Sequence, residues 1–144
     1  MKTRVLIALA IVAVAAPISS QAGTAATPKT KLCGQIKHGP RTTYTMMINN
    51  KKITGTTWTV FATGAPCSKA MTEARPILKW WKTAKVGASD YSAHGFGCNK
   101  EADRKGRSGS VGCSYAGGPS GANIELMMTG KYTIAQLKKM FFIH

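Results

Sequence analysis

Residues 66–85, PCSKAMTEARPILKWWKTAK, form the longer of two segments whose apolar residues recur with helical spacing. At 3.6 residues per turn these side chains fall on one stripe, and the charged side chains lie elsewhere on the helix. Pro66 suits the first helical position, whereas Pro76 has no N–H to donate and should kink the helix. The segment therefore predicts an amphipathic helix whose stripe must be covered by another part of the fold. The stripe comprises Cys67, Ala70, Met71, Ala74, Ile77, Leu78 and Trp81, and the charged positions outside it are Lys69, Glu73, Lys79 and Lys82.

A shorter helix is predicted at residues 133–142. It opens with TIAQ (133–136), the pattern of a capping box, in which the Thr and Gln side chains bind backbone N–H groups of the first turn. Helical spacing then predicts an apolar stripe and a charged edge. The stripe comprises Ile134, Leu137 and Phe141, and the residues facing water are Lys138 and Lys139.

Four segments around these helices have strand character, because they are rich in β-forming residues next to turn signals. They are residues 43–48, 56–63, 110–116 and 122–128. Residues 94–98 are a fifth candidate, because this segment must bring Cys98 alongside another part of the fold. Within 56–63, Trp58, Val60 and Ala62 alternate with Thr57, Thr59 and Phe61. The order of two strands, a helix, three strands and a helix predicts an α+β fold. We expect a small antiparallel sheet packed on one main helix, stapled by disulfides, with a short C-terminal helix.

The first 22 residues have the features of a signal peptide. A positively charged start, MKTR, precedes an apolar run at residues 5–16, and Ser20-Gln21-Ala22 fits the small-x-small cleavage pattern. The apolar run is shorter than the ~20 residues needed to span a bilayer. We therefore predict cleavage near Ala22-Gly23, a flexible lead-in at 23–31 and a single α+β domain at 32–144, with no transmembrane segment. The expected location is secreted, periplasmic or cell-wall-associated.

All four cysteines lie in the part of the chain that we expect to be exported. An even number of cysteines in a short exported chain predicts a disulfide framework. The sequence allows three pairings of Cys33, Cys67, Cys98 and Cys113. The favoured pairing joins Cys98 to Cys113 across a hairpin, and Cys33 to Cys67 between the first strand and the start of the helix.

The chain is strongly basic. Without Lys2 and Arg4 of the expected signal peptide, 18 of the 20 basic residues remain against 5 acidic residues, a net charge of +13. Such a charge favours anionic partners, among them envelope polymers, nucleic acid and acidic lipids. The alternative is that secreted proteins of the source organism are generally basic.

Two groups of basic residues are candidates for binding anions. One lies in NKEADRKGRSGSVG (99–112), which is either a phosphate-contacting loop without base specificity or, as we favour, a solvated hairpin tip. The other flanks Trp80, which either covers the rim of the core or stacks on a sugar or base. The candidate anion-binding residues are Lys79, Lys82, Lys100, Arg104, Lys105 and Arg107, and Trp80 is the candidate partner contact.

No local motif links the residues that acid–base catalysis would need. A ribonuclease-like site would require His94 and Glu125, the candidate catalytic residues, to converge with Arg41 or Arg75 in one cleft. GRSGS (106–110) lacks the strand-to-helix context of a nucleophile elbow or a phosphate loop. The sequence therefore favours a domain without catalysis.

Two cysteine–histidine pairs can be drawn as zinc ligands, Cys33-x4-His38 and His94-x3-Cys98. Neither has the close ligand spacing of a structural zinc site. An oxidising compartment also favours disulfides over thiolate ligands. We predict no metal and no cofactor.

The layout of these motifs resembles a class of small secreted bacterial proteins that have four cysteines and no assigned activity. The matching pieces span roughly residues 33–128: Cys33-Gly34, Trp58-x-Val60-x-Ala62, Cys67-x-x-Ala70, Gly95-Phe96-x-Cys98 and Cys113. The resemblance implies a common fold, and it brings no catalytic residues to carry over. Pro76 and the predicted C-terminal helix depart from the pattern of the class.

Three classes of function remain open. The favoured one is a basic, disulfide-stabilised secreted domain that binds an anionic or envelope-associated partner without catalysis. Nucleic acid, bound nonspecifically, is a possible partner of this kind. The alternatives are a small secreted hydrolase such as a ribonuclease, and a secreted inhibitor or protein-binding module.

Overall fold

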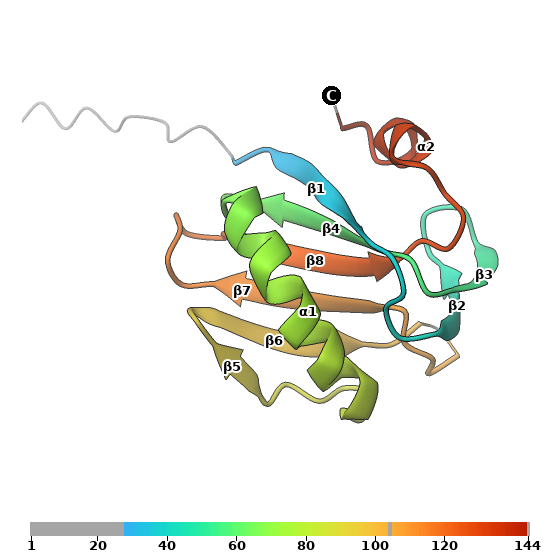
Figure 1. Cartoon of the computed structure of the whole chain (residues 1–144), viewed down its shortest axis with the longest axis horizontal. Coiled ribbons are helices and arrows are strands. Elements are labelled where there is room, and N and C mark those ends of the chain that lie inside the picture. The colour runs from blue at the N-terminus through green and yellow to red at the C-terminus, as the bar shows by residue number, and fades with distance from the viewer. Residues whose placement is uncertain (1–27, 104, 144) are drawn as a thin grey trace, which may run out of the picture.

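The computed structural model describes residues 28–103 and 105–143. The expected signal peptide and residues 23–27 of the expected lead-in lie outside the described residues, as do Arg104 and His144. The described chain has an antiparallel sheet, two helices and two disulfides, which confirms the predicted α+β fold (Figure 1). Among the described residues, no helix is long and apolar enough to cross a membrane.

Six strands form the main sheet, in the order β1-β4-β8-β7-β6-β5, and every neighbouring pair is antiparallel (Figure 1). Their bounds are β1 Thr30–Ile36, β4 Trp58–Thr63, β5 Tyr91–Ala93, β6 Phe96–Glu101, β7 Ser110–Tyr115 and β8 Asn123–Met128. In β8, Ile124, Leu126 and Met128 are buried and alternate with more exposed residues. This alternation is typical of an antiparallel strand with one face on the core. β1 begins at Thr30, so the fold starts two residues before the expected boundary at residue 32.

A separate hairpin of β2 (Thr42–Met46) and β3 (Lys51–Gly55) lies beyond one end of the main sheet (Figure 1). Tyr44 fastens this hairpin to the sheet. Its hydroxyl donates to the carbonyl of Met128 at 3.0 Å, and its ring lies where a side chain at Gly109 would otherwise be. The hairpin therefore has a fixed position relative to β8.

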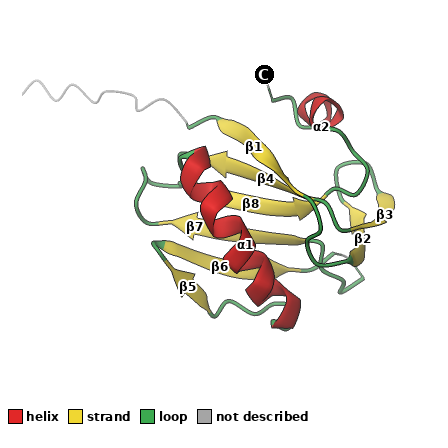
Figure 2. Cartoon of the chain, in the orientation of Figure 1, coloured by secondary structure: helices red, strands yellow, loops and turns green. Residues whose placement is uncertain are grey.

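Helix α1 (Cys67–Thr83) crosses one face of the sheet and packs its apolar stripe against it (Figures 1 and 2). Ile77, Leu78 and Trp81 are buried there, and the ring centroids of Trp81 and Trp58 are 4.8 Å apart. Full burial of each large apolar side chain contributes about 1.5–3 kcal/mol. The helix continues through Pro76, which lies on its exposed side.

Glu73 departs from the predicted pattern, because helical spacing placed it on the charged side and the structure buries it. Its carboxylate lies 2.6 Å from Nδ1 of His94 and accepts a hydrogen bond from the hydroxyl of Tyr91 at 3.2 Å. A buried carboxylate is costly unless it has such partners. The predicted placement was wrong because the partners come from β5 and the turn after it, which helical spacing does not reveal.

Helix α2 (Ile134–Met140) covers a corner of the opposite face of the sheet. The capping box is confirmed: Thr133 Oγ1 accepts from the backbone N–H of Gln136, and Gln136 Oε1 accepts from that of Thr133. The ring of Phe141 lies 4.9 Å from that of Phe61 of β4. Ile134 is 42% exposed, so its predicted place in the apolar stripe was wrong.

Both favoured disulfides are present. Cys33–Cys67 joins β1 to the first residue of α1, and Cys98–Cys113 links directly opposed residues of β6 and β7. The described chain has no free cysteine, so neither zinc pair drawn from the sequence has a thiolate to offer.

Candidate anion-binding groove

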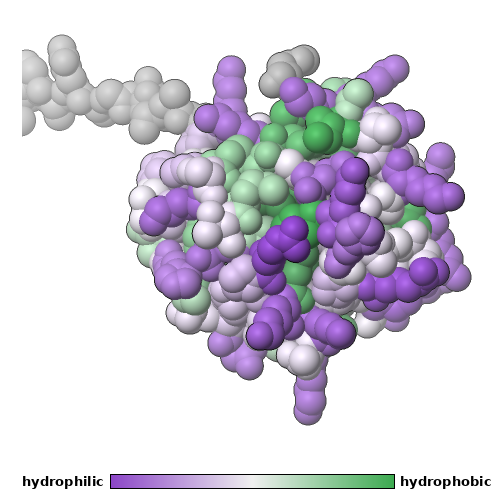
Figure 3. Space-filling view, viewed as in Figure 1, coloured by the Kyte–Doolittle hydropathy of each residue, from purple (hydrophilic) through white to green (hydrophobic). Residues whose placement is uncertain are grey.

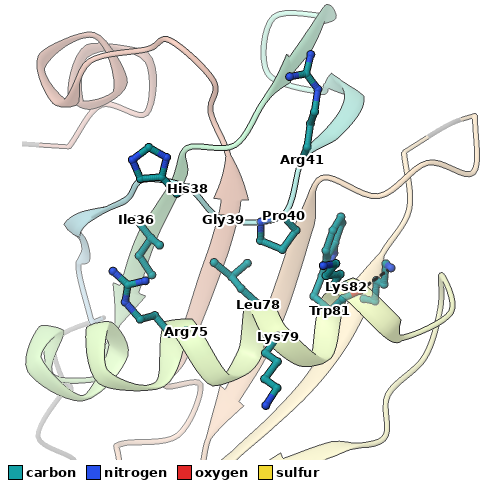
Figure 4. A pocket seen from close by; sticks show the side chains of 11 residues that line it. Ile36, His38, Gly39, Pro40, Arg41, Arg75, Leu78, Lys79, Trp81 and Lys82 are labelled. Atoms are coloured by element: carbon teal, nitrogen blue, oxygen red, sulfur yellow. Dashed lines mark hydrogen bonds between the residues drawn. The ribbon is translucent and has the colours of Figure 1, made fainter.

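A groove with a volume of about 720 Å³ lies between α1 and the loop that joins β1 to β2 (Figure 4). Its floor is apolar and its edges are basic, and none of the described residues that line it is acidic. The floor comprises Ile36, Pro40, Leu78 and Trp81, and the basic lining residues are His38, Arg41, Arg75, Lys79, Lys82 and Lys100. On the same face, hydrophobic surface is visible between hydrophilic side chains (Figure 3).

Gly39 and Trp58 fix the loop side of the groove. The backbone N–H of Gly39 donates to the carbonyl of Thr56 at 2.8 Å, and Trp58 Nε1 donates to the carbonyl of Pro40 at 2.9 Å. A Cβ on Gly39 would collide with the Trp58 indole, so this close approach requires glycine. His38 adopts a φ of 60°, in the left-handed region, which completes the tight turn. The loop backbone is therefore held against the core.

Three cations from α1 form the other edge of the groove. Arg75, Lys79 and Lys82 recur at intervals of four and three residues, so they follow one side of the helix, and all three are exposed. In Figure 4 Arg75 extends toward His38, whereas Lys79 extends away from the loop. Their charges and that of Arg41 add to a positive potential over the groove, which attracts anions.

Lys100 lines the groove but differs from the other cations because it is buried. Its ammonium donates to the carbonyls of Trp81 and Ala84, each at 2.7 Å, and lies 4.2 Å from the centroid of the Trp81 ring. A cation is favoured at these C-terminal helix carbonyls and over an indole face. Burial lowers the pKa of Lys100. This predicted anion-binding residue therefore caps α1 and helps to shape the groove.

Lys105 and Arg107 lie outside the groove lining, in the loop between β6 and β7. Asp103 of this loop accepts hydrogen bonds from the backbone N–H groups of Thr45, Lys105 and Arg107, and from the Arg107 guanidinium. Burial alone would raise the pKa of Asp103, but these hydrogen bonds outweigh it and hold the pKa well below its usual range. The sequence favoured a solvated hairpin tip for this loop. That interpretation was wrong for Asp103, which is buried against β2. Lys105 is exposed, and the candidate Arg104 lies outside the described residues.

The structure separates the two candidate catalytic residues. His94 lies in the turn between β5 and β6 and pairs with Glu73 of α1. Glu125 lies on β8 and faces the other side of the sheet, where it lines different cavities. Arg41 and Arg75 line the groove. The residues of the ribonuclease-like constellation are therefore not brought together in one cleft.

Trp80 covers the rim of the core. Its Nε1 donates to Asp90 Oδ1 at 2.9 Å, and its ring centroid lies 5.5 Å from that of Tyr91. Because the indole is half-buried and already has these partners, it does not provide the exposed apolar patch that the protein-binding alternative requires.

Sequence reasoning named Arg41 and Arg75 only for a ribonuclease-like site with His94 and Glu125, and it missed His38 as part of an anion site. The spacing of Arg75 relative to Lys79 and Lys82 was an available signal, because it places all three on one side of the predicted helix. The contribution of the loop had no such signal, since it depends on how the loop packs on Trp58.

Comparisons of the chain with protein-family models, curated proteins and solved structures find no match. What the groove could bind is therefore inferred from its lining. The basic edges suit phosphate, sulfate or carboxylate groups, and the apolar floor suits a ring or a hydrocarbon chain.

Proposed function

We propose that the protein is a non-catalytic binding domain that holds an anionic polymer in the basic groove. The observation that carries the proposal is that Arg41 of the loop and Arg75, Lys79 and Lys82 of α1 line one groove with an apolar floor. Cations on both edges can neutralise successive charges of a polymer. Their aliphatic stems and the floor can meanwhile contact its carbon atoms.

The chemistry of the lining supports binding rather than hydrolysis. Hydrolysis of a phosphodiester by acid–base catalysis needs a base and an acid in reach of the same substrate. Among the described lining residues, His38 is the one histidine, and no carboxylate accompanies it. The groove therefore offers charges for holding an anion, without a complete acid–base pair.

Export is part of this proposal. Disulfides persist in oxidising compartments, and the signal-peptide pattern at residues 1–22 and the resemblance to secreted four-cysteine bacterial proteins point the same way. A secreted basic domain meets the anionic polymers of the cell envelope first. We therefore place an envelope polymer ahead of nucleic acid as the partner.

The proposal is tested by the binding of long-chain polyphosphate, with neutral dextran as the blank. The groove variant is Arg75→Ala/Lys79→Ala/Lys82→Ala. The matched control, Lys51→Ala/Lys52→Ala/Lys131→Ala, removes the same charge from exposed positions outside the groove. We expect the groove variant to bind about tenfold more weakly or worse, because each lost phosphate contact lowers the affinity gained by counterion release. The control should stay within about twofold of the wild type, since its cations do not contact the polymer.

The salt dependence of binding gives a second readout. In the groove variant the slope of log K against log salt should flatten by about 2–3, close to 0.7–0.9 per lost contact. Equal weakening of both variants would show that net charge alone governs binding, and the proposal would be wrong.

A further inference from the structure

A second cavity, of about 200 Å³, lies on the face of the sheet opposite α1. The turn after β2, strands β7 and β8, and Phe141 after α2 enclose it. Its walls are largely apolar, with Met46, Met47, Ile48, Met127 and Phe141 among them. Met47 is 77% exposed and Ile48 is 47% exposed, so apolar surface at this turn lies open to solvent.

Three carboxyl side chains also line this cavity, which we call the acidic slot. Asp103 is already paired with Arg107, which leaves Glu101 and Glu125. They come from β6 and β8, on either side of Gly112 of β7. Glu125 is opposite Gly112 in the sheet, and a Cβ on Gly112 would lie 2.6 Å from Glu101 Oε1. The missing side chain therefore leaves room over β7 for the Glu101 carboxylate, beside the strand that carries Glu125.

Neither carboxylate has a cation partner among the described residues. Glu101 accepts a hydrogen bond from the hydroxyl of Ser110 at 2.9 Å, and the ion pairs of the described chain involve other acids. The remaining acidic residues all have polar partners: Glu73 has His94 and Tyr91, Asp90 has Trp80, and Asp103 has Arg107. Among the described residues, Glu73 and Asp103 therefore have ion-pair partners, whereas Asp90, Glu101 and Glu125 have none, and Glu101 and Glu125 share one cavity.

The apolar surroundings make it unfavourable for Glu101 and Glu125 to be charged together without a cation. Carboxylates that share one site repel each other, and apolar walls reduce the screening of that repulsion. Burial, and then the charge of Glu101, raise the pKa of Glu125. An apolar pocket with a few convergent, perturbed polar groups is the usual form of a ligand site.

We propose that the acidic slot binds an organic cation, an ammonium or guanidinium group carried on an apolar arm. The cation would lie between the two carboxylates, and the arm would lie along the methionines, whose flexible thioethers adapt to their contacts. The slot is smaller than the roughly 300–1,000 Å³ of sites for drug-sized ligands, so one such arm fills it. A bare metal ion suits it less well, because hard cations require more oxygen ligands than the two carboxylates offer.

This site goes beyond the proposed function, since it lies outside the groove and takes the opposite charge. Its ligand could be a free alkylamine or a lysine or arginine side chain of another protein. The probes are therefore n-butylammonium, Nα-acetyl-lysine methylamide, Nα-acetyl-arginine methylamide and, as the uncharged match, Nα-acetyl-norleucine methylamide.

The readout is the ¹³C-methyl NMR signals of the methionines. We expect the cationic probes to shift Met46, Met47 and Met127 in a saturable way, and norleucine to leave them unchanged. Met71 of α1, which packs near Gly34, should stay unchanged throughout. Binding of n-butylammonium as tight as that of the two amides would assign the slot to free amines. Binding of the amides alone would assign it to protein side chains.

Two substitutions and one control complete the test. Glu125→Gln and Glu101→Gln should each weaken binding by about tenfold, the usual loss of one charge-assisted contact. Asp90→Asn removes a negative charge outside the slot and should change the affinity by less than about twofold, as expected for a screened exposed charge. The proposal is overturned if no cationic probe binds, if norleucine binds as well, or if Asp90→Asn matches Glu125→Gln. Circular dichroism confirms that each variant is folded.

Discussion

Lys100 was a candidate anion-binding residue because of its charge, but in the fold it caps the C-terminal end of α1. Its ammonium satisfies two carbonyls at the C-terminal end of α1, so Lys100→Met leaves them without that partner. We expect the free energy of unfolding to fall by about 1.5–3 kcal/mol, the usual worth of hydrogen bonds to a charged group. Urea denaturation measures this change. Lys85→Met removes an exposed charge and should alter stability by less than about 0.5 kcal/mol; equal effects would contradict the capping role.

Asp103 should make stability depend on pH at the acid end. Hydrogen bonds keep the pKa of Asp103 in the folded protein below its unfolded value of about 3.9, so the unfolded chain takes up the proton first. The resulting stability is fully present above the unfolded pKa and is lost as the pH falls through the folded pKa. We therefore expect Tm to drop less between pH 6 and pH 2 in Asp103→Asn than in the wild type. Parallel Tm curves would contradict this assignment.

Glu125 should make stability depend on pH in the opposite direction to Asp103. Because its pKa is raised in the fold, its contribution to stability is present below the unfolded pKa and is lost as the pH rises through the folded pKa. Glu125→Gln removes the repulsion with Glu101 and should raise Tm at pH 7, with little change at pH 3. Calorimetry at the two pH values checks this. A lower Tm at pH 7 would show that the carboxylate has a stabilising partner.

At the scale of elements, the sequence predicted the parts whose apolar pattern is strong. The stripe of α1, the placement of Trp58, Val60 and Ala62 of β4 in the main core, and the capping box of α2 are all confirmed. Strands β1, β3 and β5 were not predicted, because each lies at the edge of its sheet and has few buried residues. Such strands depend on backbone pairing with a neighbour, which leaves little trace in side-chain pattern.

The candidate groove was less predictable from the sequence than the helices and strands were. Lys79 and Lys82 were identified from the sequence, and Arg75 could have been added from its helical spacing. The place of Arg41 and His38 beside α1 could not be predicted, because it depends on the loop packing on Trp58. Lys100 was identified for its charge, and its burial follows from the carbonyls that it meets only in the fold.

The disulfide between β6 and β7 should stabilise the hairpin that it closes. Its cysteines are separated by 15 residues, so on the chain-entropy model Cys98→Ala/Cys113→Ala costs about 3 kcal/mol. The separation of 34 for Cys33–Cys67 corresponds to about 4 kcal/mol. Guanidinium denaturation of the two double variants measures both values. Unchanged stability in either variant would contradict a stabilising role for that bond.

At the scale of the whole molecule, the two faces of the sheet carry opposite chemistry. The groove beside α1 is lined by cations, and the slot on the other face is lined by three of the chain's 5 acidic residues. Because separate sites with no shared residue couple little, polyphosphate and the lysine probe should bind independently. Glu125→Gln should leave polyphosphate affinity unchanged within about twofold, as expected for distant independent sites. Strong competition between the two ligands would show that they share a site.

The central claim is that the groove, rather than the net charge, holds the anion. Titration of ¹⁵N-labelled protein with polyphosphate tests it directly, because each backbone amide reports its own surroundings. We predict that residues 36–41 and 75–84, on the two sides of the groove, shift first and saturate, while residues 51–54 and 131 do not. Shifts spread evenly over all basic surfaces, or concentrated at residues 51–54, would contradict the claim.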